Sequence, residues 1–243
     1  DSASIYDVVV GDAALADVID ATVGRGGTVV VPAFAVGRAQ TLLYYLWTLR
    51  EAGRLPDVPV YLDSPMAINA SELLGTYSSD HRLAPGVYEG MCDMATYTRD
   101  SEQSMKISAS TEPKNVISAS GMATGGRILH HLKAFAPDPR NTIMITGYQV
   151  PGTRGASIAA GERQVRIYGE WVLINAQVAN LAMLSAHADA DELIRWAKGF
   201  TAPPKEVFVV HGEPQPADTL RRRLGRELGW QATVSRMNQV FEL

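Results

Sequence analysis

Short, mainly apolar runs alternate along this sequence with longer segments whose apolar residues recur at helical spacing. The runs cover residues 28–31, 58–62, 115–118 and 142–146, and the helical patterns cover residues 12–23, 37–52 and 128–135. A run without polar alternation is typical of a strand that is buried on both faces of a parallel sheet. The regular alternation therefore predicts an α/β fold, a Rossmann-like parallel sheet with right-handed crossovers.

Two parts of the chain depart from this rhythm. Residues 78–111 carry only weak helical patterns, and they do not allow elements to be assigned. Residues 164–172 alternate apolar and polar side chains, which favours antiparallel strand structure. Near residue 180 the pattern changes to loop, helix, loop and strand. This change predicts two domains, residues 1–180 and residues 181–243.

The composition excludes several classes of protein. No apolar stretch among the 243 residues is as long as a membrane span, and the first residues show no signal-sequence pattern, so we expect no membrane and a cytoplasmic location. The single cysteine, Cys92, excludes an internal disulfide framework and is interpreted as a packing residue. A net charge of −4 gives no overall attraction for nucleic acid, so phosphate binding requires a local patch.

Two histidines lie at turns next to predicted elements. His187 precedes a helical pattern, and His211 directly follows the run Glu206–Val210, whose four apolar residues predict a fully buried strand of a parallel sheet. Catalytic groups in α/β proteins collect where strands end and the chain turns toward a helix. The two histidines are therefore candidates for one site. For either histidine alone, a purely structural role is the open alternative.

A glycine-rich segment at residues 118–127 joins a predicted strand to a predicted helix. Glycines let backbone N–H groups approach an anion closely, and a helix N-terminus adds a partial positive charge. The candidate phosphate-binding residues here are Ser120, Gly121, Thr124, Gly125, Gly126 and Arg127. The alternative is that the glycines only permit a tight turn. Neither a Walker loop nor G-x-G-x-x-G is present, which disfavours a Rossmann-like nucleotide enzyme.

Three arginines fall at predicted strand-to-helix turns: Arg38, Arg127 and Arg154. The planar guanidinium group can hold two phosphate oxygens at once. Convergence of these three side chains would therefore form a phosphate-binding cluster.

Other polar residues are weaker candidates. His130 and His131 are neighbours on a predicted helix, so they point to different faces and cannot act as a ligand pair. Asp63 is as consistent with a helix cap as with a catalytic acid. The basic helix face at residues 221–226 is typical of a solvated surface, with RNA contact as the alternative.

Several ordered segments resemble one family. They are P-A-F-A-V-G-R-A-Q at 32–40, S-A-S-G-M-A-T-G-G-R at 118–127, G-Y-Q-V-P-G-T at 147–153, and S-A-H-A-D with V-F-V-V-H-G-E at 185–189 and 207–213. Together they resemble the β-CASP group of the metallo-β-lactamase superfamily. That group processes nucleic acids and includes RNase J and the endonuclease subunit of the cleavage and polyadenylation specificity factor. The resemblance implies a β-CASP domain over 1–180, followed over 181–243 by the C-terminal part of a metallo-β-lactamase αββα domain.

The same resemblance implies roles for individual residues. His211 corresponds to a zinc ligand, and a histidine there is typical of RNA-directed members. His187 corresponds to the histidine that contacts the scissile phosphate, and segment 118–127 would face the nucleic-acid backbone. In the family, zinc would lower the pKa of a bound water so that hydroxide attacks phosphorus. His187 would position the phosphate or protonate the leaving oxygen.

The family's main metal-binding motif, H-x-H-x-D-H, is absent from this sequence. The five histidines are His81, His130, His131, His187 and His211. We therefore expect two zinc ions in a complete protein, whose N-terminal metallo-β-lactamase half is supplied in cis or in trans. This chain alone should be inactive.

The favoured hypothesis is an RNA-processing, metal-dependent ribonuclease that acts on single-stranded RNA. This chain would hold its RNA-binding domain and part of its active site. The alternative is a non-catalytic RNA-binding or scaffold subunit with a degenerate metal site. A homodimer is compatible with either hypothesis.

Overall fold

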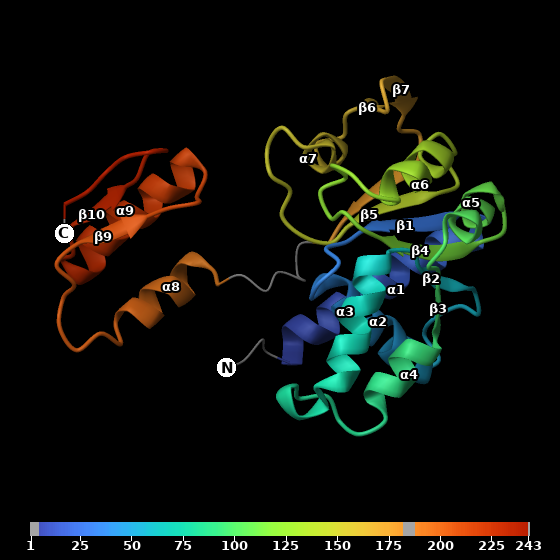
Figure 1. Cartoon of the computed structure of the whole chain (residues 1–243), viewed down its shortest axis with the longest axis horizontal. Coiled ribbons are helices and arrows are strands. Elements are labelled where there is room, and N and C mark those ends of the chain that lie inside the picture. The colour runs from blue at the N-terminus through green and yellow to red at the C-terminus, as the bar shows by residue number, and fades with distance from the viewer. Residues whose placement is uncertain (1–4, 182–187, 243) are drawn as a thin grey trace. The chain divides into compact units, whose positions relative to one another are not determined.

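The computed structural model describes residues 5–181 and 188–242. The chain divides into two compact units, Asp1–Ser185 and Ala186–Leu243, which are described separately here (Figure 1). Within the described residues, no helix combines the length and the apolar character needed to cross a bilayer.

The larger unit is built on a six-stranded sheet in the order β3-β2-β4-β1-β5-β8, with every neighbouring pair parallel. Its strands are β1 (Thr28–Pro32), β2 (Val60–Leu62), β3 (Ala95–Tyr97), β4 (Lys114–Ser118), β5 (Thr142–Ile145) and β8 (Gln177–Asn180). The central strands β1 and β4 are buried at every residue, and Val30 lies opposite Val116. Burial on both faces explains the apolar run of β1, whereas β4 also buries the polar residues Lys114, Asn115 and Ser118.

Helices cover both faces of this sheet (Figure 1). One face is covered by α1 (Ile5–Gly24), α2 (Arg38–Glu51), α3 (Pro65–Thr76) and α4 (Val87–Asp93), and the other by α5 (Ser101–Ala109), α6 (Ile128–Phe135) and α7 (Arg154–Ala159). Alternate residues of β1 enter the two cores: Val31 packs in the core that contains Leu43 of α2, and Val30 packs in the core that contains Leu132 of α6.

An antiparallel hairpin, β6 (Gln164–Ile167) and β7 (Glu170–Leu173), packs on the α6 face. Its turn residues Tyr168 and Gly169 have φ values of 50° and 82°. Positive φ at both central residues is typical of a tight two-residue hairpin turn. The antiparallel prediction for residues 164–172 is confirmed.

The prediction of an α/β fold with a parallel sheet is also confirmed, with differences at its margins. Helix α1 begins at Ile5, well before the predicted start at residue 12. The unassigned segment 78–111 holds η1 (Ser78–Asp80), α4, β3 and α5. Strands β3 and β8 lie at the two edges of the sheet and are only partly buried. They lack the apolar run of a central strand, so the pattern did not reveal them.

The smaller unit contains α8 (Ala190–Ala197), β9 (Val207–Val209), α9 (Pro214–Leu228) and β10 (Ala232–Val234). Strands β9 and β10 pair in parallel as a two-stranded sheet. The buried core of this unit consists of Ile194, Ala197, Val209, Ala217 and Leu224. The expectation that β9 is fully buried is wrong for this unit, because Val207 and Phe208 stay partly exposed on a sheet of only two strands.

Candidate functional site

The loops that follow β1, β2, β4 and β5 open at the same edge of the large sheet, because these strands are parallel. They are residues 33–37, 63–64, 119–127 and 146–153. We call this region the carboxyl edge. Ligands of open α/β sheets bind outside the carboxyl ends of the strands, so this edge is the candidate site.

The glycine loop, residues 118–127, is held in shape by its own hydrogen bonds. Ser120 N donates to Gly125 O at 3.2 Å, and Thr124 N donates to Ser120 Oγ at 3.1 Å. Gly126 has φ +78°, and a Cβ there would lie 2.4 Å from Ala119 O. Glycine is therefore required at this position by the backbone itself.

The loop after β5 is fastened to the glycine loop. Gln149 Nε2 donates to Gly121 O at 3.2 Å, and Gly155 N donates to Met122 O at 3.0 Å. Arg154, the first residue of α7, donates from Nη1 to Ala123 O at 3.2 Å. The guanidinium of Arg154 also donates from Nε to Arg166 O. Arg154 thus ties three segments together.

Arg38 begins α2 beside the loop after β5. A Cβ built on Gly147 would lie 3.6 Å from Arg38 Nη2, which places the guanidinium against that glycine. Burial lowers the pKa of Arg38, with Tyr45 acting in the opposite direction. Arg38 N donates to Val36 O at 3.1 Å, but within the described part of the chain the Arg38 side chain makes no hydrogen bond or ion pair. Its donors therefore remain available at the carboxyl edge.

Arg127 ends the glycine loop, and its donors are directed to protein acceptors. Its Nη1 lies 2.6 Å from Asp63 Oδ1 and donates to Thr98 O at 3.0 Å, and its Nη2 donates to Arg99 O at 2.6 Å. The Arg127 side chain is 20% exposed, whereas that of Asp63 is fully buried. A buried carboxylate requires such partners.

Asp63 also accepts hydrogen bonds from two other elements. His131 Nε2 of α6 lies 2.7 Å from Asp63 Oδ2, and Ser104 of α5 donates its hydroxyl to the same oxygen. Burial alone would raise the pKa of Asp63. The hydrogen bonds from His131, Ser104 and Arg127 outweigh it and hold the pKa of this carboxyl below its usual range. We call these four residues the Asp63 cluster. It fastens the loop after β2 to both α5 and α6.

The second nitrogen of His131, Nδ1, lies 3.0 Å from Ser108 Oγ, so the buried ring is satisfied on both sides. Its neighbour His130 is exposed and lies 3.1 Å from the hydroxyl of Tyr168. The prediction that these two histidines point to different faces is confirmed.

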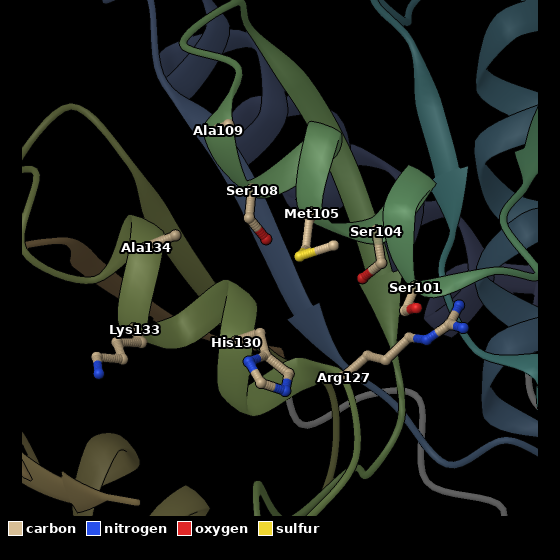
Figure 2. A pocket seen from close by; sticks show the side chains of 9 residues that line it. All are labelled: Ser101, Ser104, Met105, Ser108, Ala109, Arg127, His130, Lys133 and Ala134. Atoms are coloured by element: carbon tan, nitrogen blue, oxygen red, sulfur yellow. The ribbon is translucent and has the colours of Figure 1, made fainter.

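A cavity of about 640 Å³ lies between α5 and α6. Figure 2 shows Ser104, Met105 and Ser108 on the α5 wall, with His130 and Arg127 on the α6 side. The Asp63 cluster supplies Ser104 and Arg127 to this lining. Arg127 therefore connects the cavity with the glycine loop.

His211 follows β9 in the smaller unit and is exposed, with φ +63°. This backbone region is uncommon for residues other than glycine, although histidine adopts it more often than most. His187 lies outside the described residues, so the structure gives no distance between the two histidines. Their predicted pairing stays a prediction. Among residues 5–181 and 188–242, no group of three His, Cys, Asp or Glu side chains is arranged to hold a metal ion. Zinc requires three or four protein ligands. His211 with its described surroundings does not fit a complete zinc site.

The basic face of α9 is neutralised by nearby carboxylates. Arg221 and Arg222 pair with Asp218, and Arg223 pairs with Asp191 and Glu227. These contacts agree with the interpretation of a solvated surface.

The structure brings Arg38, Arg154 and the glycine loop together at one edge of the larger unit, whereas His211 belongs to the other unit. The sequence pattern did not reveal that Asp63 and His131 meet in a buried cluster. Ser64, rather than Asp63, caps α3 by accepting a hydrogen bond from Ala67 N at 3.3 Å. An acid placed before a capping serine at a strand end is the signal that could have identified Asp63.

Two families match this chain. Residues 39–158 match the family described as Beta-Casp domain, and residues 171–235 match the Zn-dependent metallo-hydrolase RNA specificity domain. The second match begins in β7 and includes β8, so it draws on both compact units.

Curated relatives match over most of the chain. Ribonuclease TTHA0252 of Thermus thermophilus is 38% identical over 92% of this chain and 52% of its own length. Transcription termination factor FttA of Pyrococcus abyssi is 33% identical over 88% of this chain and 35% of its own length. An RNase J-like protein of Methanocaldococcus jannaschii is 32% identical over 82% of this chain and 46% of its own length. The chain therefore spans about half or less of these relatives.

Proposed function

This chain belongs to the β-CASP family of the metallo-β-lactamase superfamily, and we propose that it forms the RNA-binding part of a zinc-dependent ribonuclease that processes single-stranded RNA. The family's descriptions name RNA specificity and zinc dependence, and one relative is named a ribonuclease. Because the chain covers only part of these relatives, the activity is proposed for a complete protein.

The observation that carries the proposal is the carboxyl edge of the larger unit. A glycine loop at a helix start offers backbone N–H groups to an anion. Arg38, the first residue of α2, lies beside this edge, and its side chain makes no hydrogen bond to any described residue. A cation beside such a loop supports binding of a phosphodiester backbone. This binding would be local, because the chain as a whole carries a net charge of −4.

The proposed phosphate contacts are those of the glycine loop together with the arginines, namely Ser120, Gly121, Thr124, Gly125, Gly126, Arg38, Arg127 and Arg154. The arginines differ in what they can offer. Arg127 and Arg154 already donate to backbone carbonyls, so they would hold the loops and give phosphate only their remaining N–H groups. Arg38 would make the principal side-chain contact.

The proposed active site is shared with residues outside the described part of the chain. His211 would be one zinc ligand and His187 would contact the scissile phosphate, as the family resemblance implies. The remaining ligands of two zinc ions would come from a metallo-β-lactamase half, in cis or in trans. Since the described residues do not complete a zinc site, no catalytic step is derived from their geometry.

A non-catalytic RNA-binding or scaffold role is the second candidate function. Several relatives are named transcription termination factors, a name that does not specify hydrolysis. The two functions differ in whether the complete protein cleaves RNA.

The test is an assay of the full-length protein on labelled single-stranded RNA, with zinc content measured on the same sample. We expect cleavage that depends on bound zinc. The His187→Ala protein should retain zinc and lose turnover by about 10²–10⁴-fold, the range for a lost proton-transfer group. A full-length protein that binds zinc and RNA but leaves the RNA intact would support the scaffold function instead.

A further inference from the structure

Two aromatic side chains at the carboxyl edge are exposed to solvent. Phe34, in the loop after β1, is 48% exposed, and Tyr148, in the loop after β5, is 60% exposed. Some other exposed aromatic rings have ring partners: Trp196 packs against Phe200 with ring centroids 5.1 Å apart. Within the described part of the chain neither Phe34 nor Tyr148 has an aromatic partner.

Both rings belong to segments that are fixed beside the glycine loop. A Cβ built on Gly121 would lie 3.0 Å from Phe34 Cδ2 and 3.0 Å from Phe34 N. Gln149, next to Tyr148, donates from Nε2 to Gly121 O at 3.2 Å and to Gly147 O at 3.3 Å. The backbone of Gly121 is therefore close to Phe34 and is also hydrogen-bonded to the Tyr148 segment.

A cation lies next to both aromatic segments. Arg38 belongs to the same turn as Phe34, since Ala39 N donates to Phe34 O at 3.1 Å. The guanidinium of Arg38 lies against Gly147, the residue that precedes Tyr148. Phe34, the segment that carries Tyr148 and the guanidinium of Arg38 thus all border the glycine loop or the loop fastened to it.

We infer that Phe34 and Tyr148 form a base-stacking site, on which unpaired nucleobases lie while the phosphates between them meet Arg38 and the glycine loop. Proteins that bind single-stranded nucleic acid combine a positive groove with aromatic side chains on which bases stack. The inference rests on the proposed function and adds to it which side chains would bind the bases of the RNA. It requires unpaired bases, because paired bases do not offer a free face to a side chain.

A protein surface is the other occupant that exposed aromatic side chains could receive. The apolar neighbours Val36 and Val150, which are 70% and 38% exposed, belong to the same edge. Arg38 and the partly exposed glycine-loop segment 124–127 favour nucleic acid, since both offer donors suited to phosphate. Binding of RNA with and without bases distinguishes the two occupants.

The test compares two ligands of equal length and charge on the full-length protein. One is a single-stranded 2′-O-methyl RNA, chosen to resist cleavage, and the other is the same backbone without bases. Tyr148→Ala and Phe34→Ala should each weaken binding of the RNA by about 5- to 150-fold, the range for one lost stacked base. Binding of the abasic backbone, and the dependence of RNA binding on salt, should not change. Tyr148→Phe should restore RNA binding because the ring is retained.

Tyr77 provides the matched control. It is 58% exposed and lies at the C-terminal end of α3, whose N-terminal end is at the carboxyl edge. Tyr77→Ala should leave binding of both ligands unchanged. A fluorescent adenine analogue in the RNA should be quenched by the wild-type protein and less quenched by Tyr148→Ala.

The stacking site would be overturned if the alanine variants lost equal affinity for the RNA and for the abasic backbone. It would also be overturned if they lost no affinity for the RNA. Alanine variants that keep RNA affinity but lower the melting temperature of the full-length protein would assign the rings to a protein interface and would also overturn it. Failure of the ribonuclease proposal would be distinguishable from failure of the stacking site. If the wild-type protein cleaves no RNA but shows the base-dependent loss in Tyr148→Ala, the stacking site stands and catalysis does not.

Discussion

Replacing Asp63 with asparagine removes a charge from a fully buried position while leaving the side-chain volume almost unchanged. The carboxylate is 2.6 Å from Arg127 Nη1 and 2.7 Å from His131 Nε2, and it accepts a third bond from Ser104. Removing one partner of a buried ion pair costs about 3–5 kcal/mol. The amide oxygen of asparagine can still accept one of the three bonds. We therefore expect the free energy of unfolding to fall by about 3 kcal/mol, near the lower end of that range.

The measurement is urea unfolding of wild-type and Asp63→Asn protein at neutral pH. The control is Glu72→Gln, because Glu72 pairs with Arg99 on the surface and both side chains are more than half exposed. An exposed pair of this kind contributes about 0–1 kcal/mol. A loss in Asp63→Asn no larger than that of the control would refute the idea that the Asp63 cluster fastens the loop after β2 to α5 and α6.

Acid unfolding gives an independent check on the same carboxylate. The folded-state pKa of Asp63 is lowered, so its contribution to stability is fully present above its unfolded-state pKa of about 3.9. This contribution is lost as the pH falls through the lower, folded-state pKa. Wild-type stability should therefore drop more steeply than that of Asp63→Asn below about pH 4. Parallel curves would contradict the assignment.

Three further predictions concern the loops and the histidine. Gly126→Ala should destabilise the larger unit by about 2 kcal/mol or more, because φ is +78° and the new Cβ would meet Ala119 O. The control is Gly125→Ala, where a Cβ meets nothing within 4 Å, and it should change stability by about 0.5 kcal/mol or less. Arg38→Ala should lower the slope of log affinity for RNA against log salt by about one unit, as expected for one lost phosphate contact; an unchanged slope would remove Arg38 from the RNA site. His211→Ala in the full-length protein should lose zinc, measured by elemental analysis, without a change in circular dichroism, since the side chain is exposed; full retention of zinc would remove His211 from the ligand set.

The sequence by itself determined the central strands, the helices that connect them and the glycine loop. A strand such as β1 (TVVVP), buried at every residue, is apolar at nearly every position, and this pattern is visible without any knowledge of its neighbours. The glycine loop is likewise specified locally. Gly126 has a positive φ and lies too close to Ala119 O of the same loop for a residue with a Cβ. The order of family motifs was also readable, since it depends only on the linear sequence.

Only the tertiary structure decided what Asp63 and Arg127 do. Arg127 follows Asp63 by 64 positions and His131 follows it by 68, so nothing local indicates that the three meet in one buried cluster. The sequence pattern offered Arg127 as a phosphate ligand on the same terms as Arg38. The fold separates them, since Arg127 faces a buried carboxylate and Arg38 does not. The edge strands β3 and β8 were hidden for a related reason: a half-exposed strand is defined by the neighbour that it pairs with, and only folding supplies that neighbour.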